Sequence, residues 1–122
     1  MVGAREIELA GRLADVAGGV IRPFFRTKYD HEAKSDATPV TEADRAAEAA
    51  IRAILDVDCP TDAIVGEEYG EKPGTSGRSW IIDPIDGTIS FMAGRPIFGT
   101  LIALLEDGWP VLGVIDQCIS GE

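Results

Sequence analysis

The sequence has few of the residues that build the commonest transition-metal sites. It contains one histidine, His31, and two cysteines, Cys59 and Cys118, which lie far apart and form no CxxC pattern. A zinc site with sulfur and imidazole ligands is therefore disfavoured. We expect both cysteines to be small buried hydrophobic residues.

Basic residues are also scarce, because 11 Lys and Arg stand against 21 Asp and Glu, for a net charge of -10. This balance argues against nucleic acid or an anionic membrane as partner, and an anionic substrate would need cations to approach. The sequence has no apolar run long enough to span a bilayer and no basic segment followed by an apolar one. It therefore predicts neither a membrane span nor a signal peptide, and the cytoplasm is the expected location.

What the sequence does contain is enough apolar material for one domain with a core, at 45% of 122 residues. Residues 5–25 carry apolar side chains three and four positions apart, which predicts an amphipathic helix. The residues expected on its buried face are Ile7, Ala10, Leu13, Ala14, Ala17, Val20, Ile21 and Phe24.

A second helix is expected to begin near Thr41, whose hydroxyl can cap the helix, with Asp44 three residues later. For Thr41 we prefer this capping role to a role in a functional site. The residues expected on the buried face of the helix are Ala47, Ala50, Ile51, Ile54 and Leu55.

Strand patterns follow the two helices. Residues 63–68 form a short apolar strand ending in acids, a glycine-rich turn covers residues 70–78, and residues 79–83 form a buried strand. Residues 97–107 and 109–116 predict an antiparallel hairpin. This order predicts an α/β (α+β layered) fold, a single domain with helices packed on one face of a mostly antiparallel sheet.

Two carboxylates, Asp83 and Asp86, lie three positions apart just beyond a predicted strand. Pro84 fixes φ after the first, and Gly87 allows a tight turn after the second. Such a loop can direct both carboxylates and the carbonyl of Ile85 toward one point. An Asp-Pro turn with a local hydrogen bond is the competing interpretation.

Glu67 and Glu68 end the preceding strand in the same way, so parallel or neighbouring strands would bring four acids to one edge of the sheet. Four carboxylates repel one another unless protons or cations intervene. Oxygen ligands without sulfur or imidazole select Mg²⁺, Mn²⁺ or Ca²⁺, and Mg²⁺ typically combines one or two carboxylates with a substrate phosphate. The spacing of an EF-hand loop is absent.

Three segments together resemble the inositol monophosphatase family of Mg²⁺-dependent, Li⁺-sensitive phosphatases. They are PVTEAD at residues 39–44, GEE at residues 66–68 and WIIDPIDGT at residues 80–88, in this order. Residues 99–117 are similar to the bacterial histidinol-phosphate phosphatases of this family. The resemblance implies an inositol-monophosphatase-like sugar phosphatase fold, of which residues 1–122 form the amino-terminal part without the carboxy-terminal half.

The resemblance also implies how the site works. The metal ligands would be Glu67, Asp83, Asp86 and the carbonyl of Ile85. Thr88, supported by Asp44, would orient the attacking water together with Glu67.

Further roles follow from the same resemblance. The backbone amides of Gly87 and Thr88 would hold phosphate oxygens, and Glu68 would support the site. Lys34 would lie on a loop that closes over the metals, although it also fits an ordinary solvated lysine.

The resemblance implies that the substrate is a small phosphorylated metabolite. Its hydrolysis would require Mg²⁺, or Mn²⁺ in its place, and would be inhibited by Li⁺. Histidinol phosphate or inositol monophosphate is the expected phosphate ester, and a sugar bisphosphate and a nucleotide 3′-phosphate stay open. An unpaired edge at residues 111–116 predicts a homodimer or a higher assembly. The alternative is a catalytically silent domain that only binds metal or oligomerises.

Overall fold

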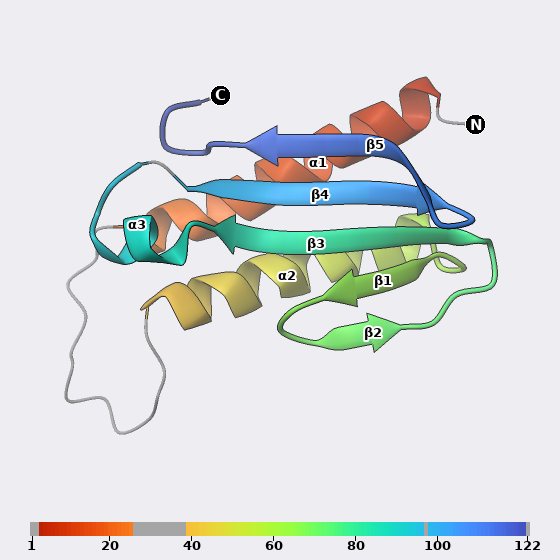
Figure 1. The fold of residues 1–122 in the computed structure, drawn as a ribbon, viewed down its shortest axis with the longest axis horizontal. Coiled ribbons are helices and arrows are strands. Elements are labelled where there is room, and N and C mark those ends of the chain that lie inside the picture. Colours follow the sequence, from red (N-terminus) through yellow and green to blue (C-terminus); the bar gives the residue numbers. More distant parts are fainter. Residues whose placement is uncertain (1–2, 26–38, 97, 122) are drawn as a thin grey trace.

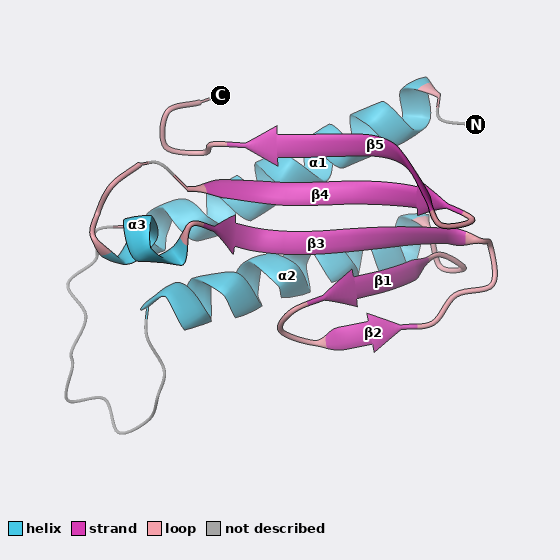
Figure 2. Cartoon of the chain, in the orientation of Figure 1, coloured by secondary structure: helices cyan, strands magenta, loops and turns pink. Residues whose placement is uncertain are grey.

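The computed structural model describes residues 3–25, 39–96 and 98–121. They form a five-stranded sheet in the order β2-β1-β3-β4-β5, with two long helices on one of its faces (Figure 1). β1 runs parallel to β3 and every other pair is antiparallel, which confirms the predicted layered fold (Figure 2). In chain order the elements are α1 (Ala4–Ile21), the 3-10 turn η1 (Arg22–Phe24), α2 (Pro39–Asp58), β1 (Ala63–Gly66), β2 (Gly70–Lys72), β3 (Arg78–Asp86), α3 (Thr88–Met92), β4 (Gly99–Glu106) and β5 (Trp109–Asp116).

Helix α1 is confirmed but ends at Ile21, earlier than predicted. Pro23 lacks the N–H that would continue the helix, so the chain tightens into η1. Gly18 stays inside the helix, where an added Cβ would lie 2.9 Å from the Cβ of Cys118, so this glycine permits close packing of α1 on the end of the chain. Ile7 was predicted to be buried and is 57% exposed.

Helix α2 begins at Pro39, so the prediction that Thr41 is its N-cap is wrong. Proline suits the first turn of a helix, because its missing N–H would have no partner there. Ala47, Ile51 and Leu55 are buried as predicted, whereas Ala50 and Ile54 are only partly buried.

The strands differ from prediction at their ends. β1 stops at Gly66, which leaves Glu67 and Glu68 in the turn that follows. The predicted glycine-rich turn contains a short strand, β2, which pairs with β1. β3 extends through Asp86, so Asp83 and Asp86 lie within the strand and not beyond it.

The hairpin of β4 and β5 is confirmed. Asp107 (φ 49°) and Gly108 (φ 85°) connect the strands, and both take the left-handed conformation that a tight hairpin turn uses. β5 pairs only with β4 among the described strands, so it lies at an edge of the sheet, as predicted.

The two faces of the sheet have different environments. The face beneath α1 and α2 holds the core, with side chains at most 2% exposed: Ile64, Trp80, Ile82, Ile102 and Leu104. The opposite face carries no described helix and exposes Val65, Ile81 and Ile115. Cys118 is buried as predicted, Cys59 is only partly buried, and both are free thiols. None of the helices described is long and apolar enough to cross a membrane.

Candidate metal and phosphate site

The parallel pairing of β1 and β3 determines where the acids gather. Gly66 is opposite Ile82 in this register, so the turn after β1 and the end of β3 lie at the same edge of the sheet. Glu67 and Glu68 follow β1 directly, and Asp83 follows Ile82 on β3. The predicted meeting of these strand ends at one edge is confirmed.

An irregularity in β3 brings its two aspartates to the same side. The register with β4 shifts between Asp83 and Asp86, which are opposite Leu101 and Gly99 respectively. Residues three apart in a regular strand point to opposite faces, and one extra residue in a bulge restores them to the same side. The bulge is held by Thr100, whose hydroxyl donates a 2.8 Å hydrogen bond to the carbonyl of Pro84.

Asp44 reaches this edge from α2. It is 8% exposed, and its pKa is raised to about 7, first by burial and then by the charges of Glu68, Asp83 and Glu67. A hydrogen bond from the backbone N–H of Ile85 opposes the rise. Asp44 therefore holds a proton far more readily than an exposed aspartate does.

Asp83 experiences the same crowding. Burial raises its pKa, the neighbouring charges of Glu67 and Asp86 raise it further, and the N–H of Ile85 lowers it. We call the five coupled carboxylates, Asp44, Glu67, Glu68, Asp83 and Asp86, the acid edge.

Within residues 3–25, 39–96 and 98–121, one basic side chain approaches the acid edge. Arg45 lies 4.0 Å from Glu68, and 60% of the arginine side chain is exposed. A pair this long and this exposed compensates little of the repulsion among the acids. A divalent cation would relieve that repulsion.

The donor set of the acid edge fits a hard cation, because all its side-chain ligands are oxygens. No three His, Cys, Asp or Glu side chains in the described part of the chain are placed as a ready-made metal cluster. The fit therefore rests on ligand chemistry and on the raised pKa of Asp44 and Asp83, to which burial contributes most and the neighbouring carboxylates contribute next.

Gly87 and Thr88 continue directly from β3 into the short helix α3. Gly87 has φ 94°, which glycine adopts freely, and its carbonyl accepts a 3.1 Å hydrogen bond from the N–H of Phe91. Thr88 is the exposed first residue of α3. Lys34 lies outside the described residues.

One residue that belongs to this region was not predicted. Glu48 is fully buried on α2, one helical turn after Asp44, and it accepts hydrogen bonds from the backbone of the turn after β1. The available signal was a glutamate on the apolar face of a helix, between Ala47 and Ile51, with Arg52 four residues later.

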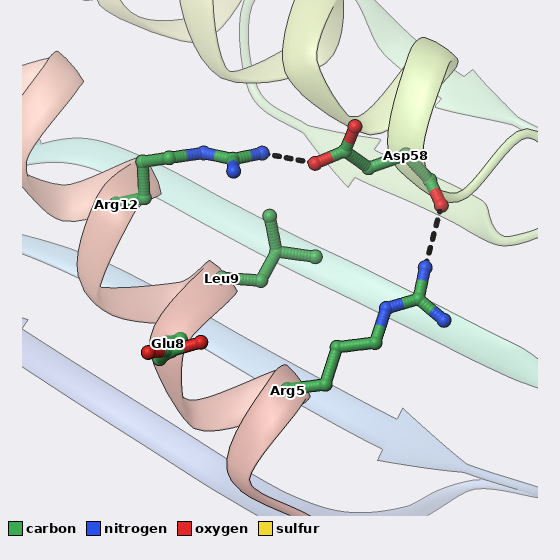
Figure 3. A pocket seen from close by; sticks show the side chains of 5 residues that line it. All are labelled: Arg5, Glu8, Leu9, Arg12 and Asp58. Carbon is green, nitrogen blue, oxygen red and sulfur yellow. Dashed lines mark hydrogen bonds and ion pairs between the residues drawn. The ribbon is translucent and has the colours of Figure 1, made fainter.

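A polar pocket lies at the other end of α2, with a volume of about 410 Å³ (Figure 3). Arg5 and Arg12 reach into it from α1, which makes it a candidate for binding anions. Both guanidinium groups already bind Asp58: Arg12 pairs with its carboxylate, and Arg5 lies 3.2 Å from its carbonyl oxygen. Because Glu8 adds a further negative charge, this pocket is poorly suited to phosphate.

Comparison with known proteins agrees with the geometry. A profile of the inositol monophosphatase family matches residues 4–122. The chain is 52% identical over 112 residues to the chloroplastic bifunctional phosphatase IMPL2 of Arabidopsis thaliana, covering 90% of this chain and 32% of that protein. It is 47% identical over 118 residues to the histidinol-phosphatase of Chlorobaculum parvum, covering 96% and 46%.

A solved structure is similar as well. The inositol monophosphatase from Zymomonas mobilis superimposes with a TM-score of 0.86 at 54% identity, covering 99% of this chain and 47% of that one. The chain thus spans between about a third and a half of the length of these relatives.

Proposed function

The chain belongs to the inositol monophosphatase family, and from that membership we propose that residues 1–122 form the amino-terminal domain of a Mg²⁺-dependent phosphomonoesterase. The observation that carries the proposal is the acid edge. Five carboxylates from α2, the turn after β1 and the end of β3 gather there, and burial together with the charges of Glu68, Asp83 and Glu67 raises the pKa of Asp44 to about 7.

The residues have distinct parts in the proposed reaction. Glu67, Asp83, Asp86 and the carbonyl of Ile85 would hold the metal, and Mn²⁺ could replace Mg²⁺. Bound metal would lower the pKa of a water molecule and neutralise charge on the phosphate and the departing alkoxide. Li⁺ inhibition is expected from family membership.

The protein's own groups would orient the reactants. Thr88, supported by Asp44, would orient the attacking water through a hydrogen bond, together with Glu67. The backbone amides of Gly87 and Thr88 hold the phosphate oxygens, and their position at the end of β3 supports this role. Glu68 and Lys34 are proposed as supporting residues.

Histidinol phosphate is our first candidate substrate, because a relative named histidinol-phosphatase is 47% identical over 96% of this chain. Inositol monophosphate is the second candidate, supported by the structure from Zymomonas mobilis. Both are small phosphate monoesters, and metal held at the acid edge would bind the phosphate they share.

We also propose that the 122-residue chain associates with a second copy of itself. The exposed sheet face carries a shallow apolar pocket of about 500 Å³, lined by residues of β3, β4 and β5 that include Ile81, Leu101 and Ile115. β5 adds an edge to which another strand could pair. Sedimentation of the purified chain would show a dimer or larger species, and a monomer at every concentration would contradict this. A cytoplasmic location stays a prediction.

The test of the function separates binding from turnover. Calorimetry with Mn²⁺ measures whether the 122-residue chain binds metal, and Asp83→Asn should abolish that binding. Phosphate release with Mg²⁺ is then measured on this chain and on any longer product of the same gene, against histidinol phosphate and inositol 1-phosphate.

We expect metal binding by the short chain and turnover only by a longer product. Saturable turnover by the short chain, lost in Asp83→Asn, would show that the short chain is active after all. Metal binding with no turnover by either product would favour the alternative, a silent metal-binding or oligomerisation domain. Absence of metal binding would reject the proposed function.

A further inference from the structure

Glu48 is a fully buried carboxylate whose hydrogen bonds reach the turn that carries Glu67. Its Oε1 accepts from the backbone N–H of Glu68 at 3.1 Å, and its Oε2 accepts from the N–H of Tyr69 at 3.0 Å. These are the two residues directly after Glu67. The carboxylate therefore fixes the backbone immediately beside a proposed metal ligand.

Gly66 makes room for this contact. A Cβ at position 66 would lie 2.4 Å from the carboxylate of Glu48, a distance that no side chain tolerates. The glycine of the GEE segment thus allows α2 to bring its glutamate up against the end of β1. The close approach ties the turn to the helix that also carries Asp44.

Arg52 secures the other side of the same turn. Its Nε donates a 3.0 Å hydrogen bond to Glu48, and its Nη2 donates to the carbonyl of Gly70, where β2 begins. The guanidinium also lies 5.9 Å from the centre of the Tyr69 ring. Arg52 compensates the buried charge of Glu48 and binds the turn at its far end.

We propose that Glu48 and Arg52 are a positioning pair that sets the place of Glu67 at the acid edge. The inference rests on the proposed function, because Glu67 is a metal ligand only under that proposal. Two backbone N–H groups and a carbonyl that follow Glu67 are held from one helix, so this part of the turn cannot shift without breaking these contacts. Partners that orient a metal ligand typically change affinity by about 10- to 100-fold when they are removed.

The test compares Mn²⁺ affinity in matched variants of the 122-residue chain. Glu48→Gln keeps the size of the side chain but replaces one acceptor oxygen with an NH₂ group that faces a donor. We expect calorimetry to show Mn²⁺ affinity lowered by about 10-fold or more, with circular dichroism showing that the variant is folded.

The matched control is Glu106→Gln. Glu106 pairs with Arg78 at 2.7 Å at the opposite end of β3, so this variant also loses a carboxylate–arginine contact. We expect its stability to fall while its Mn²⁺ affinity stays unchanged. A loss of affinity in Glu106→Gln equal to that in Glu48→Gln would reduce the effect to general destabilisation and overturn the inference.

A second variant tests the same inference if Glu48→Gln does not fold. Arg52→Lys keeps the positive charge beside Glu48 but loses the planar group that also reaches Gly70. We expect a smaller loss of Mn²⁺ affinity, by about 3-fold, in a folded protein. If Arg52→Lys and a folded Glu48→Gln both bind like the wild type, the positioning role is wrong while the proposed function stands. If the wild type binds no Mn²⁺, both are wrong.

Discussion

The carboxylates at the two ends of helix α2 have opposite surroundings. At its carboxy-terminal end, Asp58 is bound by Arg12 and by Arg5 (Figure 3). We call these three residues the paired end. Near its amino-terminal end lies the acid edge, where burial and then the neighbouring negative charges raise the pKa of Asp44 to about 7.

Buried carboxylates elsewhere in the structure have hydrogen-bond donors as partners. Asp62 is as buried as Asp44, at 5% exposed, and both its oxygens accept hydrogen bonds, from Ser76 at 2.6 Å and from Trp80 Nε1 at 2.9 Å. Acids with a structural role in this molecule therefore have donors or cations beside them. The acid edge keeps its mutual repulsion, which a bound cation would turn into attraction.

The largest difference between the two ends is expected in catalysis. In a longer, active product, Thr88→Ala should lower turnover by about 10² to 10⁴-fold, because the attacking water loses a group that positions it for proton transfer. The melting temperature should hardly change, since Thr88 is exposed. Asp58→Asn at the paired end is the control and should leave turnover unchanged. Equal turnover in wild type and Thr88→Ala would leave Thr88 as a simple helix start.

The next effect concerns pH and needs no substrate. Below about pH 4 Asp44 is protonated in both states, so it does not affect stability. Between pH 4 and its folded pKa of about 7, the unfolded chain releases the proton and the folded chain retains it. The metal-free protein should thus lose on the order of 2–4 kcal/mol of unfolding free energy over this range.

Urea unfolding at several pH values measures this loss. Asp44→Asn should remove it, because the amide does not ionise, and Asp58→Asn should retain it. Excess Mg²⁺ should weaken it in the wild type. A pH dependence that is identical in wild type and Asp44→Asn would show that Asp44 is not the group responsible.

Substitutions near the two ends of α2 should also differ in their effect on metal affinity, by a smaller factor than in turnover. Asp86→Asn should lower Mg²⁺ or Mn²⁺ affinity by about 10-fold or more with the fold intact, because it removes a ligand and relieves repulsion. Asp56→Asn breaks the exposed pair of Asp56 with Lys72 and should bind metal as the wild type does. Calorimetry that finds the same affinity in Asp86→Asn and wild type would remove Asp86 from the ligand set.

The smallest effect is expected from breaking the paired end itself. Arg12 and Asp58 are both partly exposed, so Asp58→Asn should cost about 0.2–1 kcal/mol of unfolding free energy at low salt. High salt should reduce this cost, because it screens the ion pair. A cost of several kcal/mol in urea unfolding would mean that the ion pair is an important part of the structure.

Local patterns were sufficient for much of this molecule. The spacing of Leu13, Ala17 and Ile21 predicted α1, and the Asp107-Gly108 dipeptide predicted the hairpin turn. These features succeed because helix periodicity and turn conformation depend on neighbours a few residues away. The predicted start of α2 was wrong because Thr41 is a plausible cap, whereas the helix begins at Pro39, a residue that the first helical turn also accepts.

For the site, the sequence by itself determined which ligand chemistry is available, because the identities of Glu67, Asp83 and Asp86 and the scarcity of histidine and cysteine leave only oxygen donors. Only the tertiary structure decided how these groups meet. The parallel register of β1 and β3, the bulge before Asp86 and the approach of Glu48 through Gly66 all join segments distant in sequence. The raised pKa of Asp44 follows from that meeting, because Coulomb repulsion and desolvation depend on distance in space and not on separation along the chain.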